Sequence, residues 1–205
     1  MIRVCLLLMM LLGSLTVEAE TLLVLGDSIS AGYGLNQLEE GWVALLKRKL
    51  RPRGIDVVNA SISGDTTAGG VTRIDELLLR VKPSLVIIEL GGNDGLRGLT
   101  PAQMEANLTR MIEKARAAGA RVLLVGMRIP PNYGKRYAEM FQNIYGEVAQ
   151  RTGVALVPFL MDGVGGHDEL IQADGIHPNQ AAQPLLLEQV LTKLEPLLAP
   201  QQPAK

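Results

Sequence analysis

The chain has 205 residues, of which 47% are hydrophobic, and this is enough for one domain with a sizeable apolar core. Twenty Lys and Arg residues against 21 Asp and Glu residues leave a net charge of -1. Composition therefore gives no electrostatic reason to expect nucleic acid or an anionic membrane as partner, and the substrate is not expected to be a polyanion.

The first 19 residues differ from the rest of the chain. Arg3 precedes an apolar run from Val4 to Leu12, and Val17 and Ala19 occupy the -3 and -1 positions of a cleavage site. This pattern predicts a secretory signal peptide over residues 1–19 and an exported, periplasmic protein. A membrane anchor is the alternative, but the apolar run has about half of the ~20 residues that a spanning helix needs.

Short apolar runs alternate with longer amphipathic segments after the signal. The apolar runs have the length and β-branched content of buried strands, and they cover residues 21–26, 56–61, 85–90, 121–127 and 154–159. Helices are predicted at Gly41 to Leu50, Val71 to Arg80, Pro101 to Ala118, Tyr137 to Arg151 and Gln180 to Leu198. Since the strands are apolar throughout, we expect one domain over residues 20–205: an α/β fold with a five-stranded parallel sheet in a three-layer α/β/α sandwich, as in flavodoxin-like folds.

Polar and glycine-rich stretches follow four of the predicted strands. They are Gly26-Asp27-Ser28, residues 61–66, residues 91–94 and residues 174–178. Ligands of such sheets bind at the carboxyl ends of the strands, so these stretches are where a site is expected. Each stretch alone has a plainer interpretation, as a helix cap or a turn.

Ser28 becomes a candidate nucleophile when it is considered together with a base. A serine hydroxyl is too weakly acidic to attack a carbonyl unaided, and imidazole is the usual base. His177 lies three residues after Asp174, a spacing that lets the carboxylate face the ring and hold its tautomer. Ser28, Asp174 and His177 are therefore the predicted catalytic residues, and Asp27 is interpreted as a supporting residue.

Three groups are candidates for binding an oxyanion. The amide of Gly64 can approach a ligand closely because glycine has no side chain, and Asn93 carries a neutral amide donor. The amide of Ser28 is the third donor. The predicted oxyanion hole consists of Ser28, Gly64 and Asn93.

The blocks GDSIS, SGDT, GGND and DGIHP resemble, in order, those of the SGNH family, also called GDSL hydrolases, over about Thr21 to Leu198. The family's name residues correspond here to Ser28, Gly64, Asn93 and His177, with Asp174 as the triad acid. Ile29 replaces the leucine of the name motif, a mild apolar exchange. NASISGDTTAGG and IELGGNDGLRG are similar to stretches of exported bacterial members with combined thioesterase, lysophospholipase and arylesterase activity. The resemblance implies an SGNH hydrolase fold and a serine esterase with a broad range of small acyl ester and thioester substrates.

Three connecting segments overhang the carboxyl edge of the predicted sheet, at residues 96–102, 127–137 and 159–172. Ordinary connection is the alternative interpretation, although it poorly explains a structureless stretch of about twenty residues. We predict an apolar groove for an acyl chain, lined by Leu96, Leu99, Ile129, Pro131, Tyr133 and Phe159. Trp42 and Phe141 are expected in the core.

No metal or cofactor is expected. Cys5 is the only cysteine and lies in the signal, so residues 20–205 offer no disulfide, zinc thiolate or cysteine nucleophile. His167, Asp168, Asp174 and His177 match none of the standard zinc spacings, and His167 is interpreted as a solvated loop residue.

Nothing in the sequence indicates an oligomer, so a monomer is the default expectation. Two other functions remain open. A carbohydrate O-acetylesterase of the same fold would use aromatic sugar platforms, but only 3% of the residues are aromatic. A non-catalytic, flavodoxin-like binding protein would cradle a phosphate or nucleotide at the strand ends. Neither a Walker loop nor G-x-G-x-x-G follows the first predicted strand, which disfavours that reading.

Overall fold

The computed structural model describes residues 20–198, and the predicted signal peptide at residues 1–19 lies outside this range. The strands are β1 (Thr21–Gly26), β2 (Asp56–Asn59), β3 (Leu85–Glu89), β4 (Arg121–Val125) and β5 (Ala155–Val157). They form one sheet in the order β2-β1-β3-β4-β5, and every neighbouring pair is parallel. The predicted five-stranded parallel sheet is confirmed.

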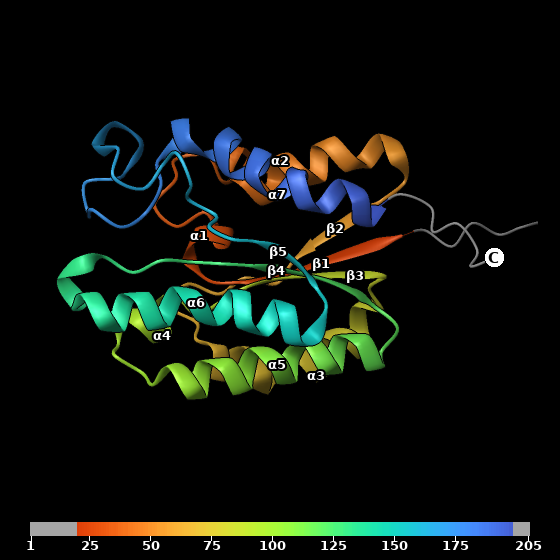
Figure 1. Ribbon diagram of the computed structural model, residues 1–205. Coiled ribbons are helices and arrows are strands. Elements are labelled where there is room, and N and C mark those ends of the chain that lie inside the picture. Colours follow the sequence, from red (N-terminus) through yellow and green to blue (C-terminus); the bar gives the residue numbers. More distant parts are fainter. Residues whose placement is uncertain (1–19, 199–205) are drawn as a thin grey trace, which may run out of the picture.

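Helices cover both faces of this sheet. They are α1 (Ser28–Ala31), α2 (Trp42–Leu50), α3 (Thr67–Val81), α4 (Gly92–Leu96), α5 (Pro101–Ala117), α6 (Lys135–Thr152) and α7 (Gln183–Leu198). Helices α2 and α7 pack together on one face, and α5 lies between α3 and α6 on the other (Figure 1). The predicted three-layer α/β/α sandwich is confirmed. Within residues 20–198, no helix is long and apolar enough to cross a membrane.

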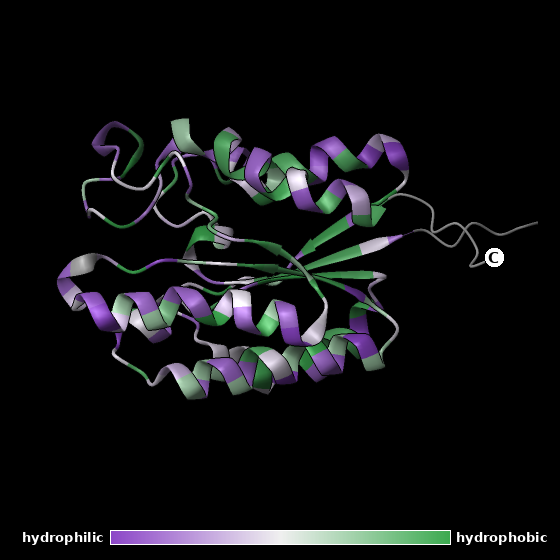
Figure 2. Cartoon of the chain, in the orientation of Figure 1, coloured by the Kyte–Doolittle hydropathy of each residue, from purple (hydrophilic) through white to green (hydrophobic). Residues whose placement is uncertain are grey.

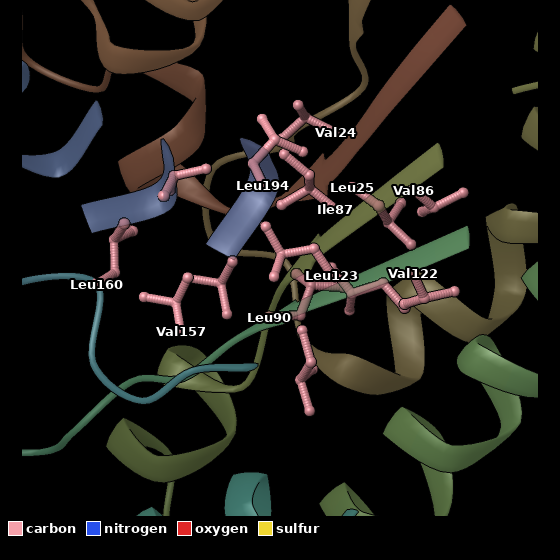
Figure 3. Packing of buried hydrophobic residues seen from close by; sticks show 14 of the residues in the cluster. Val24, Leu25, Val86, Ile87, Leu90, Val122, Leu123, Val157, Leu160 and Leu194 are labelled. Carbon is pink, nitrogen blue, oxygen red and sulfur yellow. The ribbon is translucent and has the colours of Figure 1, made fainter. Parts of the chain in front are cut away.

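The strands form the core because they are apolar on both faces. Leu22 to Leu25 of β1 and Leu85 to Ile88 of β3 have no exposed surface. Figure 2 shows the strands as largely hydrophobic, whereas the helices mix hydrophobic with hydrophilic residues. Figure 3 shows buried side chains of the sheet and of Leu194 from α7 in the same cluster. Trp42 and Phe141 are buried, as expected.

Helix α3 begins four residues earlier than predicted, at Thr67 instead of Val71. Thr66 caps it by accepting a hydrogen bond from the amide of Gly69. Gly69 and Gly70 have low helix propensity, so the sequence pattern starts the helix too late. Gly70 nevertheless fits this turn, since a Cβ there would lie 2.5 Å from Leu90 Cδ1.

Three strands end two residues earlier than predicted, at Asn59, Val125 and Val157. Beyond these ends the backbone forms the loops of the carboxyl edge. The amide of Leu160, for example, donates to the carbonyl of Gly126 at 2.9 Å. The segment after β3, interpreted as a turn, contains the short helix α4.

Candidate active site

Ser28 lies in the turn that follows β1. The side chain of Asp27 caps α1 by accepting a hydrogen bond from the amide of Ile29 at 3.0 Å. Gly26 has no room for a side chain, since a Cβ would lie 2.7 Å from the Ser30 side chain and 2.8 Å from Glu89 Oε2. The turn holds Ser28 at the carboxyl edge of the sheet, where 9% of its surface is exposed.

The loop of residues 171–178 brings His177 to Ser28. The amide of Gln172 donates to the carbonyl of His177 at 2.8 Å, which closes the loop. The side-chain amide of Gln172 donates to the carbonyl of Tyr33 at 2.8 Å, which ties the loop to the segment after α1. In this position His177 Nε2 lies 2.9 Å from Ser28 Oγ, although 149 residues separate the two in the sequence.

Asp174 shapes the same loop and orients the imidazole. Its Oδ1 accepts hydrogen bonds from the amides of Ile176 and His177 at 2.9 and 3.0 Å, and its Oδ2 lies 2.6 Å from His177 Nδ1. Burial alone would raise the pKa of Asp174, but these hydrogen bonds and the imidazole outweigh it and lower the pKa from 3.8 to about 2. The ionised carboxylate can accept a hydrogen bond from Nδ1–H, and in that tautomer the imidazole presents the Nε2 lone pair to Ser28 Oγ.

Tyr33, which the sequence analysis did not select, packs against His177. The two ring centroids are 4.6 Å apart, with an angle of 42° between the planes. The side chain of Tyr33 is 53% exposed, so its position is not explained by burial in the core. An aromatic residue five positions after Ser28, in a stretch of small residues, was the signal that could have identified it.

Asn93 lies in the first turn of α4 and lines a pocket together with Ser28 and His177. Its Nδ2 donates a hydrogen bond to Asp27 Oδ2 at 3.1 Å. One N–H of the side-chain amide is thus engaged by Asp27, and the second remains for a ligand.

Gly64 lies in the loop after β2, with a φ of +79° that favours glycine. Its carbonyl accepts a hydrogen bond from Arg97 Nη2 at 2.8 Å. The amide of Ile62 donates to the carbonyl of Gly26 at 3.0 Å, which joins this loop to the end of β1. The loop thus adjoins the Ser28 turn, although Gly64 is not among the described residues that line the pocket.

The pocket beside Ser28 has a volume of about 590 Å³. Three of the predicted groove residues, Leu96, Ile129 and Phe159, line it. Six further apolar residues that were not predicted also line it, namely Ile29, Met127, Pro130, Met161, Ile171 and Ile176. Met127 and Met161 are more than 90% buried, and a single sequence does not distinguish a pocket wall from the core.

Leu99 and Tyr133, also predicted for the groove, are not among the described residues that line this pocket. The carbonyl of Leu99 accepts a hydrogen bond from the Tyr137 hydroxyl at 2.8 Å, which fixes the backbone against α6 and leaves the leucine side chain 38% exposed. Tyr133 ends a short 3-10 turn and is 41% exposed. The side chain of Pro131, also predicted there, lies outside the described part of the structure.

The second histidine, His167, is exposed on the loop before the 171–178 segment. Its Nδ1 lies 3.3 Å from a carboxylate oxygen of Glu169. Among residues 20–198, no group of three or more His, Cys, Asp and Glu side chains is arranged to hold a metal ion.

The sequence profile of the GDSL-like lipase/acylhydrolase family matches residues 24–184. The chain belongs to this family. The resemblance that the four sequence blocks indicated is thereby confirmed. Among its relatives, esterase TesA of Pseudomonas aeruginosa is 60% identical over 182 residues, which are 88% of this chain and 90% of TesA. Thioesterase 1/protease 1/lysophospholipase L1 of Escherichia coli is 46% identical over 180 residues, 88% of this chain and 86% of the relative.

A solved structure shows the same fold for this GDSL-like chain. The psychrotrophic esterase EstA from Pseudoalteromonas sp., in a crystal structure inhibited by monoethylphosphonate, matches it with a TM-score of 0.82 and 44% sequence identity. The match covers 87% of this chain and 98% of EstA. The SGNH hydrolase fold that the resemblance implied is confirmed.

Proposed function

We propose that this protein is a serine esterase that hydrolyses small acyl esters and thioesters, including arylesters and lysophospholipids, with Ser28, His177 and Asp174 as its triad. The observation that carries the proposal is the hydrogen-bonded row of these three side chains beside an apolar pocket. The names of the relatives, esterase and thioesterase/lysophospholipase, support the same chemistry.

Acylation begins when Ser28 Oγ attacks the carbonyl carbon of the substrate. His177 Nε2, at 2.9 Å, takes the hydroxyl proton as the carbon–oxygen bond forms. The tetrahedral intermediate then expels the alcohol or thiol, which receives the same proton from Nε2. Asp174 remains ionised throughout and stabilises the imidazolium through its 2.6 Å contact with Nδ1.

Deacylation repeats these steps with water as the nucleophile. His177 Nε2 takes a proton from the water while its oxygen attacks the acyl-serine carbonyl, and the proton then returns to Ser28 Oγ as the acid leaves. The oxyanion of both tetrahedral intermediates is assigned to N–H donors of Ser28, Gly64 and Asn93. Losing one such donor typically lowers kcat by ~10²–10³-fold.

The acyl chain is assigned to the apolar pocket. Its wall holds isoleucine, methionine and phenylalanine side chains, which favour a hydrocarbon chain over a sugar. The pocket therefore favours acyl ester hydrolysis over carbohydrate deacetylation, and it offers no glycine-rich phosphate loop of the Walker kind.

A fluorophosphonate probe tests the proposal, because it labels an activated serine covalently. We expect the wild type to be labelled and Ser28→Ala to be unlabelled. Ser84→Ala is the matched control, since Ser84 precedes β3 at the amino edge of the sheet, and it should label as the wild type does. A folded wild-type protein that is not labelled would contradict the serine mechanism. A series of p-nitrophenyl esters from two to sixteen acyl carbons would then define the chain-length preference.

We further propose export to the periplasm as a monomeric single domain. The support is the sequence pattern of residues 1–19 described above. The mass of the protein recovered from a periplasmic fraction should correspond to a chain that begins at Glu20, and light scattering should give the mass of one chain. An intact N-terminus in that fraction would contradict the cleavage.

A further inference from the structure

Two carboxyl groups lie buried beneath the Ser28 turn, and the proposed mechanism uses neither. Asp27 is 2% exposed, and Glu89, the last residue of β3, has no exposed surface. Glu89 Oε2 lies 2.6 Å from Ser30 Oγ and accepts a 3.3 Å hydrogen bond from the amide of Asp27. Its Oε1 is buried and has no hydrogen-bond partner among the described residues. The two hydrogen bonds to Oε2 favour an ionised Glu89, whereas complete burial, with no partner for Oε1, disfavours it.

The surroundings of the pair shift the pKa values of the two carboxyl groups by different amounts. Burial, followed by the proximity of Asp27, raises the pKa of Glu89 well above its ordinary 4.5. Burial also raises the pKa of Asp27 from 3.8 to about 6, against the lowering effects of the Ile29 amide, His177 and Asn93. The other acidic groups that face the pair, Asp65 and Tyr145, do not offset its charge. Asp27, whose two oxygens accept hydrogen bonds from the Ile29 amide and from Asn93 Nδ2, is thus the member of the pair that ionises more readily.

An ionised carboxylate imposes an orientation on Asn93. The side-chain amide of asparagine has a donor end and an acceptor end, whereas a carboxylate only accepts. Asp27 Oδ2, 3.1 Å from Asn93 Nδ2, therefore admits the NH₂ end and repels the carbonyl end. In the reversed orientation, Asn93 would place a carbonyl oxygen where the proposed oxyanion forms. A neutral partner that both donates and accepts would tolerate either orientation.

We propose that Asp27 is a positioning residue whose carboxylate holds the Asn93 amide with an N–H toward the oxyanion, while Glu89 supports the turn from below through Ser30 and the amide of Asp27. This inference rests on the proposed esterase function. It assigns the carboxylate before the nucleophile a task in turnover that is separate from capping α1.

Asp27→Asn tests the inference because it changes the charge with little change in shape. Asparagine is as good a helix cap as aspartate, so the hydrogen bond from Ile29 can be kept. The new NH₂ group would then face the NH₂ group of Asn93. With a neutral short-chain p-nitrophenyl ester, we expect kcat to fall about 10–100-fold, toward the loss for one oxyanion donor, with KM within about threefold of wild type.

A double-mutant cycle shows whether Asp27 acts through Asn93. In an Asn93→Ala background, Asp27→Asn should lower kcat less than about threefold further, because the amide that it positions is already gone. Asp94→Asn is the matched control. Asp94 is as buried as Asp27 and adjacent to Asn93, but it accepts its hydrogen bonds from Thr67, so kcat should stay within about threefold of wild type.

Three results would overturn the inference: wild-type kcat in Asp27→Asn, losses that multiply in the double variant, or an equal loss in Asp94→Asn. Fluorophosphonate labelling of the wild type separates these outcomes from failure of the proposed function. An unlabelled wild type removes the serine mechanism itself. A labelled wild type with an indifferent Asp27→Asn removes only the positioning role.

Discussion

Replacing Asp27 by asparagine should stabilise the folded protein at neutral pH while it slows turnover. Burial raises the pKa of Asp27 from 3.8 to about 6, and each pKa unit corresponds to about 1.4 kcal/mol. The contribution of this carboxyl to folding is fully present below pH 3.8 and is lost as the pH rises through about 6. Above that pH, the ionised side chain lowers the free energy of unfolding by about 3 kcal/mol relative to a group that does not titrate.

Asp27→Asn and the wild type should differ in free energy of unfolding, and this difference should grow with pH. Its growth can be measured without knowing the other effects of the substitution. From linkage, about 1.4 kcal/mol of the 3 kcal/mol develops between pH 5 and pH 8. Urea unfolding of the wild type and of Asp27→Asn at pH 5, 6, 7 and 8 gives the two free energies of unfolding. Their difference should grow in favour of the variant and level off above pH 7.

An exposed carboxylate supplies the control for this experiment. The side chain of Asp56 is 59% exposed and forms an ion pair with Lys47, so Asp56→Asn removes a carboxylate without removing a buried one and should not reproduce the growth expected for Asp27→Asn. A difference between Asp27→Asn and wild type that is constant from pH 5 to 8 would refute the reasoning. It would mean that Asp27 is already ionised at pH 5 in the folded protein, without the cost that burial should impose.

Three further substitutions test the pocket, the triad and the packing. Ile176→Ser removes a 45% exposed side chain from the pocket wall. It should raise KM for a dodecanoyl ester by ~3–10-fold and leave KM for an acetyl ester unchanged. Leu185→Ser on α7 is the control and should change neither KM value. Asp174→Asn should lower kcat by ~10³–10⁴-fold through loss of the imidazole tautomer, with the fold intact by circular dichroism. Gly70→Ala places a Cβ 2.5 Å from its nearest neighbour and should lower the free energy of unfolding by ~1–3 kcal/mol. Gly146 lies in α6, and a Cβ added there would have no neighbouring atom within 4 Å, so Gly146→Ala should raise the free energy of unfolding by ~0.5–1 kcal/mol. Equal effects of the two glycine substitutions would contradict the packing argument.

The sheet was predictable because its strands are locally apolar on both faces. Continuous runs such as residues 85–90 indicate a buried strand without knowledge of their neighbours. Helix α3 was harder, because the start of this helix depends on the long-range contact of Gly70 with Leu90. Local propensity assigns glycine to a loop, and only the packed structure shows why its lack of a side chain is needed there.

The reacting groups of the site were predictable for a chemical reason. Serine as a nucleophile requires a base and an orienting acid, so Ser28 and His177 could be paired across 149 residues. Residues that act by shape had no comparable requirement. Met127 lies in a stretch whose sequence is typical of a core strand, yet it lines the pocket, whereas Leu99 was predicted to line the groove and is 38% exposed. Hydrophobicity alone does not say which face of a loop meets the pocket.

The carboxyl pair beneath Ser28 connects stability with the proposed turnover. Gly26 leaves the space that the Glu89 carboxyl and Ser30 occupy, and Glu89 in turn accepts the amide of Asp27. Asp27 then holds Asn93, so the contacts run without a gap from the end of β3 to the proposed oxyanion hole. A neutral or apolar residue at position 27 would spare the energy of burying a charge. Because a carboxylate accepts hydrogen bonds but does not donate them, the destabilising Asp27 side chain is also the group that keeps the Asn93 donor in place before the substrate arrives.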